Sequence, residues 1–144
     1  MIIKTKSSQF ISIGILLLFM ACHQSYASDE SQKAEVDAVM TKAAKQANEQ
    51  LVGMKVDEYT KIRFIGFDKK VPVYIYVYST SIGTGQLNAE QKRAMDVFHI
   101  NKTCGANFLP LMKNPYNLKV SHEFEDLRTG KTIYKITIGN KDCS

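Results

Sequence analysis

The sequence predicts an α+β fold in a single domain. Three observations lead to this prediction. A helical apolar stripe opens the chain after residue 30, and two pairs of segments further on show the alternation typical of strands. The length of 144 residues, with 44% hydrophobic, leaves room for one ordinary core. The expected element order is α-β-β-α-β-β, with helices packed on an antiparallel sheet of about four strands and one disulfide.

The first predicted helix covers residues 31–50. Its apolar residues recur every three or four positions, which places them on one face, and Gly53 ends the helix. The stripe contains many alanines, so the helix should lie close against a flat partner such as a sheet. The stripe consists of Val36, Val39, Met40, Ala43, Ala44, Ala47 and Leu51.

Two strands are predicted next, at 60–67 and 71–80, and the polar turn between them favours a hairpin. The second strand is apolar on both faces. One face carries Val73, Ile75 and Val77, and the other carries Tyr74, Tyr76 and Tyr78. Either both faces are covered, the tyrosines by the chain's own helix, or one is left for binding. The three tyrosines are therefore candidate partner-binding residues.

A second helix begins at Asn88, where Gln91 three positions later suggests a capping box. We expect Met95 and Phe98 to face inward and the helix to stop near Cys104. A short apolar turn at 108–112 follows. The last third is predicted to be another hairpin, with strands at 118–125 and 133–138, in which Leu118, Val120, His122 and Phe124 face the core.

The N-terminus has the features of a secretory signal. Lys4 and Lys6 precede an uncharged apolar run at 10–20, which is too short to span a bilayer permanently. Two cleavage sites compete. Cleavage after Ala27 would remove residues 1–27 as a signal peptide and leave a soluble domain at 28–144. A lipobox-like sequence ending at Cys22 would instead remove residues 1–21 and make Cys22 the lipidation site.

Cysteine usage follows from this export signal. Cys22 is either removed or acylated, so only Cys104 and Cys143 remain to pair. In an oxidising compartment two such thiols should form a disulfide, and the alternative is two separate buried thiols. The bridge would tie the end of the second helix to the end of the chain.

Neither charge nor motifs indicate catalysis. The net charge of +5 falls to +3 without Lys4 and Lys6, and the remaining lysines are spread along the chain, so we expect no nucleic-acid partner. His99 and His122 have no spacing typical of metal ligands, and His122 suits a hydrogen-bonded core histidine. We therefore expect no catalytic residue, no metal and no cofactor.

The C-terminal pattern resembles that of a known family. It has a cysteine after a helix, a strand, a polar turn with glycine, a strand and a terminal cysteine, here Cys104, 120–124, Gly130, 134–138 and Cys143. With the signal and Cys22, this looks like the pilotin lipoproteins of type II secretion systems, in the subgroup built on a helix-flanked antiparallel sheet. The resemblance covers the last half of the chain plus the signal.

The resemblance implies a protein without catalytic activity that is anchored in the outer membrane through Cys22 and binds a secretin segment there. His23 after the cysteine fits outer-membrane sorting by the family's rule, whereas cleavage after Ala27 would remove the anchor. We thus expect a protein-binding factor in the periplasm or on the outer membrane, which assists the assembly of a secretin or another envelope protein. The alternative is a soluble periplasmic inhibitor or immunity protein that blocks a toxin or hydrolase.

Overall fold

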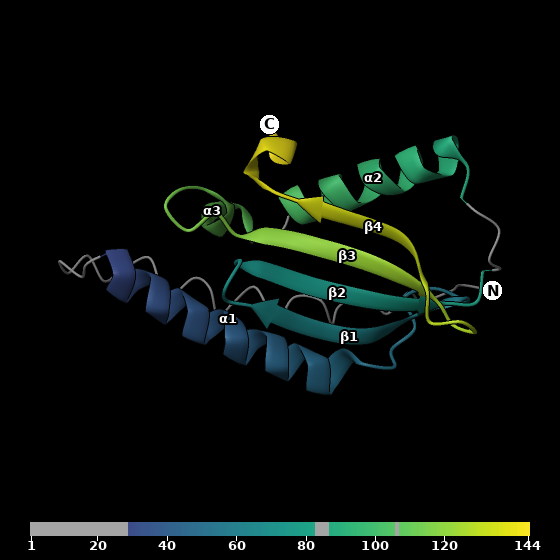
Figure 1. Ribbon diagram of the computed structural model, residues 1–144, viewed down its shortest axis with the longest axis horizontal. Helices are drawn as coiled ribbons and strands as arrows, with labels where there is room; N and C mark the ends of the chain where they lie inside the picture. Colours follow the sequence, from purple (N-terminus) through teal and green to yellow (C-terminus); the bar gives the residue numbers. More distant parts are fainter. Residues whose placement is uncertain (1–28, 83–86, 106) are drawn as a thin grey trace, which may run out of the picture.

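The structure is a computed structural model that describes residues 29–82, 87–105 and 107–144 (Figure 1). The predicted α-β-β-α-β-β order is confirmed, the short turn predicted at 108–112 forms a helix, and a further helical turn follows the last strand. The elements are α1 (Asp29–Leu51), β1 (Thr60–Asp68), β2 (Val73–Thr80), α2 (Ala89–Cys104), α3 (Leu109–Met112), β3 (Lys119–Asp126), β4 (Thr132–Ile138) and the 3-10 turn η2 (Asn140–Cys143).

The four strands form one sheet in the order β1-β2-β3-β4. Both predicted hairpins are present, since β1 pairs with β2 and β3 pairs with β4 in antiparallel fashion. The expectation of a purely antiparallel sheet is wrong, because β2 and β3 run parallel at the centre. The chain crosses from β2 to β3 through α2 and α3, and a helical crossover of this kind returns the chain to the same end of the sheet.

One face of the sheet carries the core. The register aligns Tyr74 with Val120, and Val120 with Ile138, across three strands. All three side chains are almost fully buried. From α1, Met40, Ala44 and Ala47 join the same cluster, and so does Met112 of α3. The shallow alanine-rich stripe therefore packs on a sheet, as its composition predicts.

Helix α2 also lies on this face, and its N-terminal capping box is confirmed. The Asn88 side chain accepts a hydrogen bond from the Gln91 backbone at 2.8 Å, and the Gln91 side chain accepts one from the Asn88 backbone at 2.9 Å. The prediction that Phe98 faces inward is wrong, because Phe98 is 59% exposed. His99 and Thr103 are buried instead, since the His99 ring packs on the His122 ring and Thr103 hydrogen-bonds with His122 on the strands below.

Candidate functional site: the uncovered face of the sheet

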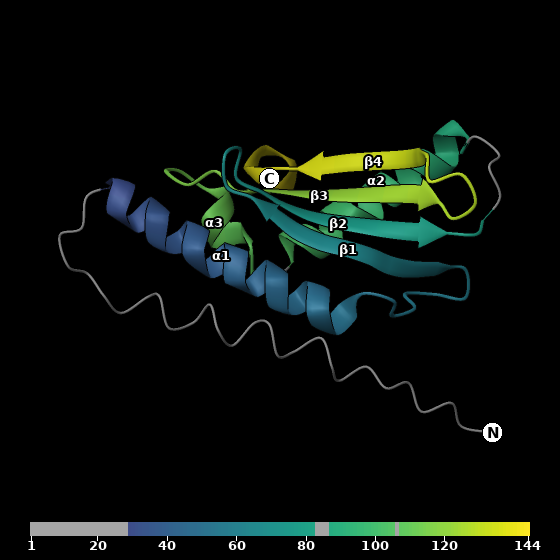
Figure 2. The same ribbon diagram turned by 60° about the horizontal axis from the view of Figure 1, so that its bottom comes forward.

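The face of the sheet opposite the core is covered by no described helix. Figure 2 shows α2 and α3 behind the strands, and α1 alongside β1. On β2, this open face carries Val73, Ile75 and Val77. The sheet is therefore apolar on both sides of β2, but only the tyrosine side is packed against helices.

Phe64 of β1 extends this apolar surface. It pairs with Val77 across the strands, and its side chain is 46% exposed. A methyl group added at Gly66 would lie 2.5 Å from the Phe64 ring, so the ring lies directly over this glycine. Gly66 is itself the partner of Ile75. The absence of a side chain at Gly66 thus leaves room for the Phe64 ring, which forms an apolar stripe with its neighbours Ile75 and the buried Val77.

The other half of the open face, on β3 and β4, is polar. Glu123 is the β3 partner of Val77 and forms an ion pair with Lys135 of β4. Ser121 accepts a hydrogen bond from Thr137 at 3.4 Å. Because both ends of the ion pair are at least partly solvated, it contributes little to stability, but it fixes a charged row beside the apolar stripe. A surface of this kind suits an amphipathic protein segment.

A shallow depression of about 410 Å³ lies at the end of this face where β2 and β3 finish. Val52 and Leu127, both exposed, supply apolar contacts at its rim. Arg63 and Glu125 line it as well and form an ion pair with each other. Arg63 lies between Ile62 and Phe64, where the β1–β2 register shifts by a β-bulge, and such bulges commonly re-aim a side chain.

The candidate tyrosines lie on the packed face. Tyr74 is 2% exposed and contacts Phe108. Tyr76 stacks on His122 at 5.2 Å between ring centroids, and Tyr78 stacks on Phe124 at 4.5 Å. Burial raises the pKa of the Tyr74 hydroxyl to about 12, so this side chain stays neutral at physiological pH. In this structure the row packs with the core, and the open face of β2 carries Val73 and Ile75, which are partly exposed, and Val77, which is buried at 9% exposure.

The two histidines that the sequence separates by more than twenty positions meet beneath α2. Their rings lie 4.4 Å apart between centroids, and both side chains are 6% exposed. His122 hydrogen-bonds through Nε2 with the Thr103 hydroxyl at 3.0 Å and through Nδ1 with the Tyr78 hydroxyl at 3.2 Å. Burial, with a smaller effect from His99, lowers the pKa of His122 to about 3. This neutral, fully bonded histidine is a structural member of the core.

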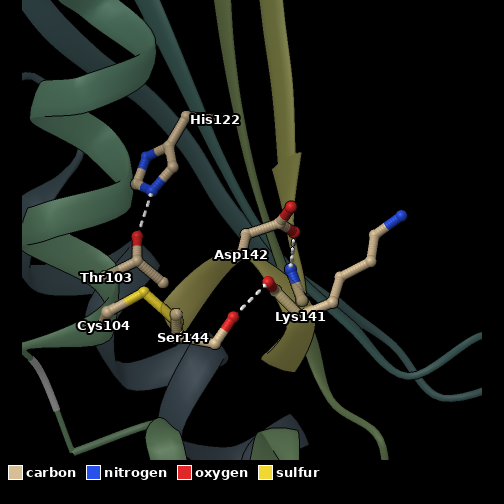
Figure 3. Close-up of a disulfide and its surroundings, with 8 residues drawn as sticks. Thr103, Cys104, His122, Lys141, Asp142 and Ser144 are labelled. Atoms are coloured by element: carbon tan, nitrogen blue, oxygen red, sulfur yellow. Dashed lines mark hydrogen bonds between the residues drawn. A yellow bond between two sulfur atoms is a disulfide. The ribbon is translucent and has the colours of Figure 1, made fainter.

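The predicted disulfide between Cys104 and Cys143 is present, with 5.4 Å between the Cα atoms. Figure 3 shows it joining the end of α2 to η2, next to the hydrogen bond between Thr103 and His122. The turn that carries Cys143 is fixed by Asp142, whose carboxylate accepts a hydrogen bond from the Gly139 N–H at 2.8 Å. The bridge therefore fastens α2 to the chain terminus beside β4.

The remaining predictions concern the N-terminus, a metal site and a membrane span. Cys22 and both candidate cleavage sites lie outside the described residues. Within the described residues, no group of three or more His, Cys, Asp and Glu side chains could hold a metal ion. None of the helices in the described part of the chain has the length and apolar character needed to cross a bilayer.

Taken together, these features define a small α+β protein whose four-stranded sheet has one helix-covered face and one open face. Two solved structures share this fold. The first is a Pseudomonas aeruginosa protein thought to be secreted, with a TM-score of 0.65 and 12% identity over 82% of this chain and 99% of that chain. The second is EpsS, a pilotin of the Vibrio vulnificus type 2 secretion system, with a TM-score of 0.60 and 11% identity over 81% of this chain and 98% of that chain.

The resemblance to pilotins is thus confirmed at the level of the fold. No protein-family model matches the chain, and no curated protein matches it in sequence.

Proposed function

We propose that this protein is a pilotin-like factor without catalytic activity. It is exported to the periplasm or anchored to the outer membrane, and it binds a segment of a secretin or another envelope protein. The observation that carries the proposal is the open sheet face, where the apolar stripe of Phe64, Ile75 and Val77 lies beside the Glu123–Lys135 pair. The similarity to a type 2 secretion pilotin over nearly the full length of that chain supports it.

The first prediction concerns the docking face. We expect Phe64→Asp to weaken binding of a synthetic peptide from the C-terminal segment of the host's secretin by tenfold or more. An added carboxylate would interrupt the apolar stripe. The loss of a partly exposed aromatic contact costs roughly 1–2 kcal/mol of binding free energy. Titration calorimetry with the exported, disulfide-bonded protein measures the change. Gln46→Asp, an exposed change on α1 that also adds one negative charge, is the matched control for charge.

Two results would count against this proposal. If the peptide binds equally well to wild type and Phe64→Asp, the open face is not the docking surface. If photo-crosslinking from position 64 in the periplasm captures a toxin or hydrolase in place of an envelope assembly protein, the inhibitor or immunity hypothesis replaces the pilotin-like one. Thermal denaturation of each variant establishes that the loss is not one of folding.

The second prediction concerns the anchor. If Cys22 is lipidated, cells grown with a fatty-acid probe will yield a labelled mature protein in the outer-membrane fraction, and Cys22→Ser will abolish the label. An unlabelled product that begins at Ser28 would show instead that cleavage after Ala27 releases a soluble protein. Mass analysis of the mature N-terminus distinguishes the two products directly.

A further inference from the structure

The two outer edges of the sheet differ in how their backbone groups are satisfied. On the β1 edge, Gly53 donates to the Ile62 carbonyl at 2.7 Å, and the Ile62 N–H donates to the Met54 carbonyl at 3.0 Å. Further along, the Ile65 N–H donates to the Asn48 side-chain oxygen at 2.8 Å. Helix α1 and the segment after it therefore hydrogen-bond to a large part of this edge.

Helix α2 packs beside β4, where the Tyr134 hydroxyl donates to Asp96 at 2.6 Å, but the outer main chain of β4 has no hydrogen-bonded cover of the kind seen at β1 (Figure 1). Figure 2 shows β4 as the outermost strand, with no described strand beside its outer edge. Within the described residues, no hydrogen bond from outside the β3–β4 pairing reaches the main chain of 132–138. Alternate residues of an edge strand direct their N–H and C=O groups outward, so β4 presents a row of groups that a further strand could bind.

The charged side chains along this edge are all positive. Residues 131–141 include Lys131, Lys135 and Lys141 and contain no aspartate or glutamate. All three lysines are exposed, and Lys135 remains 54% exposed in its ion pair with Glu123. Two copies of the chain paired edge to edge would bring these lysines together, so the charge disfavours self-association through β4.

We propose that the outer edge of β4 binds an extended acidic segment of a partner protein by strand addition. Main-chain hydrogen bonds to β4 hold the segment, and Lys131, Lys135 and Lys141 select acidic side chains. The added strand would enlarge the open face on its β4 side. This inference rests on the proposed function as a protein-binding factor and deepens it by naming the chemistry of the bound segment.

The test uses the mature, disulfide-bonded protein and three synthetic peptides of about eight residues. The first alternates glutamate and valine, the second alternates lysine and valine, and the third is the acidic peptide with alternate backbone nitrogens methylated so that it cannot pair as a strand. Backbone amide NMR shifts and hydrogen exchange locate any binding. We expect saturable binding of the first peptide alone, with slowed exchange of outward β4 amides.

A charge-reversal variant tests the lysines. Lys131→Glu, Lys135→Glu and Lys141→Glu together should weaken binding of the acidic peptide at least tenfold. The matched control reverses Lys33, Lys42 and Lys45, which are exposed on α1 and change the net charge equally. An equal loss in the control would overturn the proposal, because binding would then depend only on net charge.

Other results would also overturn the proposal. If the methylated peptide binds as well as the acidic peptide, no strand is added. If no peptide binds, the lysines serve only to keep the edge from associating. These failures are separable from that of the proposed function, because the Phe64→Asp titration examines a different surface. Retained secretin-peptide binding with no β4 protection overturns the edge proposal alone.

Discussion

Removal of the Cys104–Cys143 disulfide is expected to lower the free energy of unfolding by about 4 kcal/mol. The bridge closes a loop of 39 positions, and this cost is the loop entropy that it removes from the unfolded chain. A loss of this size is a large part of the stability of a small domain. Urea denaturation of a Cys104→Ser, Cys143→Ser double variant, compared with wild type under oxidising conditions, measures it.

The same variant has a local consequence. The disulfide joins the C-terminal end of α2 to η2, so its loss should speed hydrogen exchange in α2 and η2 before it does so in α1 and β1. Reduction of the wild-type protein with a thiol reductant should reproduce the shift. Unchanged denaturation midpoints in both experiments would mean that noncovalent packing alone holds the C-terminal part of the domain.

Acidification is expected to destabilise the protein through His122. Burial lowers the pKa of His122 to about 3 in the folded state, whereas an unfolded histidine has a pKa near 6.5. The folded state therefore binds fewer protons, and its stability falls as the pH drops below about 6.5. Between pH 7 and pH 4.5 the expected loss is about 2.5 kcal/mol at 1.36 kcal/mol per pKa unit.

The groups around His122 also favour its neutral form in the folded state. His99 faces it from α2, and burial also lowers the pKa of His99, with a smaller opposing effect from Asp96 and a small additional one from Lys102. On β2, Tyr76 and Tyr78 contact the His122 ring and remain neutral across this range, because burial raises their pKa values. Among the described residues that contact His122, none is a carboxylate that would compensate a charge on its ring.

His122→Gln is the matched control, because an amide can keep a hydrogen bond to Thr103 without titrating. Urea denaturation at several pH values between 4.5 and 7 should show a flatter dependence for this variant than for wild type, whatever its stability at pH 7. Parallel curves for the two proteins would assign the acid sensitivity to other groups. The carboxylates are the same in both proteins, so their titration near pH 4.5 cancels in the comparison.

Local chemistry made most of the elements predictable. The 3.6-residue spacing in α1 and the Asn88–Gln91 cap depend only on residues close in sequence. The same holds for the alternation of Val120, His122 and Phe124 in β3. The pairing of two cysteines was predicted from the oxidising compartment that an export signal implies. The side of α2 that faces the core was predicted wrongly, for a physical reason. Phe98 is more apolar than His99, but only His99 finds buried aromatic and histidine partners on the strands below.

The candidate site was harder to predict, because strand β2 is apolar on both faces and its own pattern cannot choose between them. The choice comes from register: Tyr76 and Tyr78 align with His122 and Phe124 of β3, and that side receives the helices. One local signal was present, since Phe64 and Gly66 two positions apart must share a face, and a glycine there leaves room for an aromatic ring. This local signal indicates an apolar stripe only when the register places Ile75 and Val77 beside Phe64.

The amino-acid sequence by itself thus determined the helices, the two hairpins and the disulfide, because each follows from spacing along the chain or from the redox chemistry of exported proteins. The tertiary structure alone decided that β2 and β3 run parallel and which face of β2 stays open. It also decided that the outer edge of β1 is hydrogen-bonded to α1 and the segment after it, while the outer edge of β4 has no such partner among the described residues. These features depend on contacts between residues far apart in sequence, and no local propensity encodes which of two apolar faces or two strand edges the helices will cover.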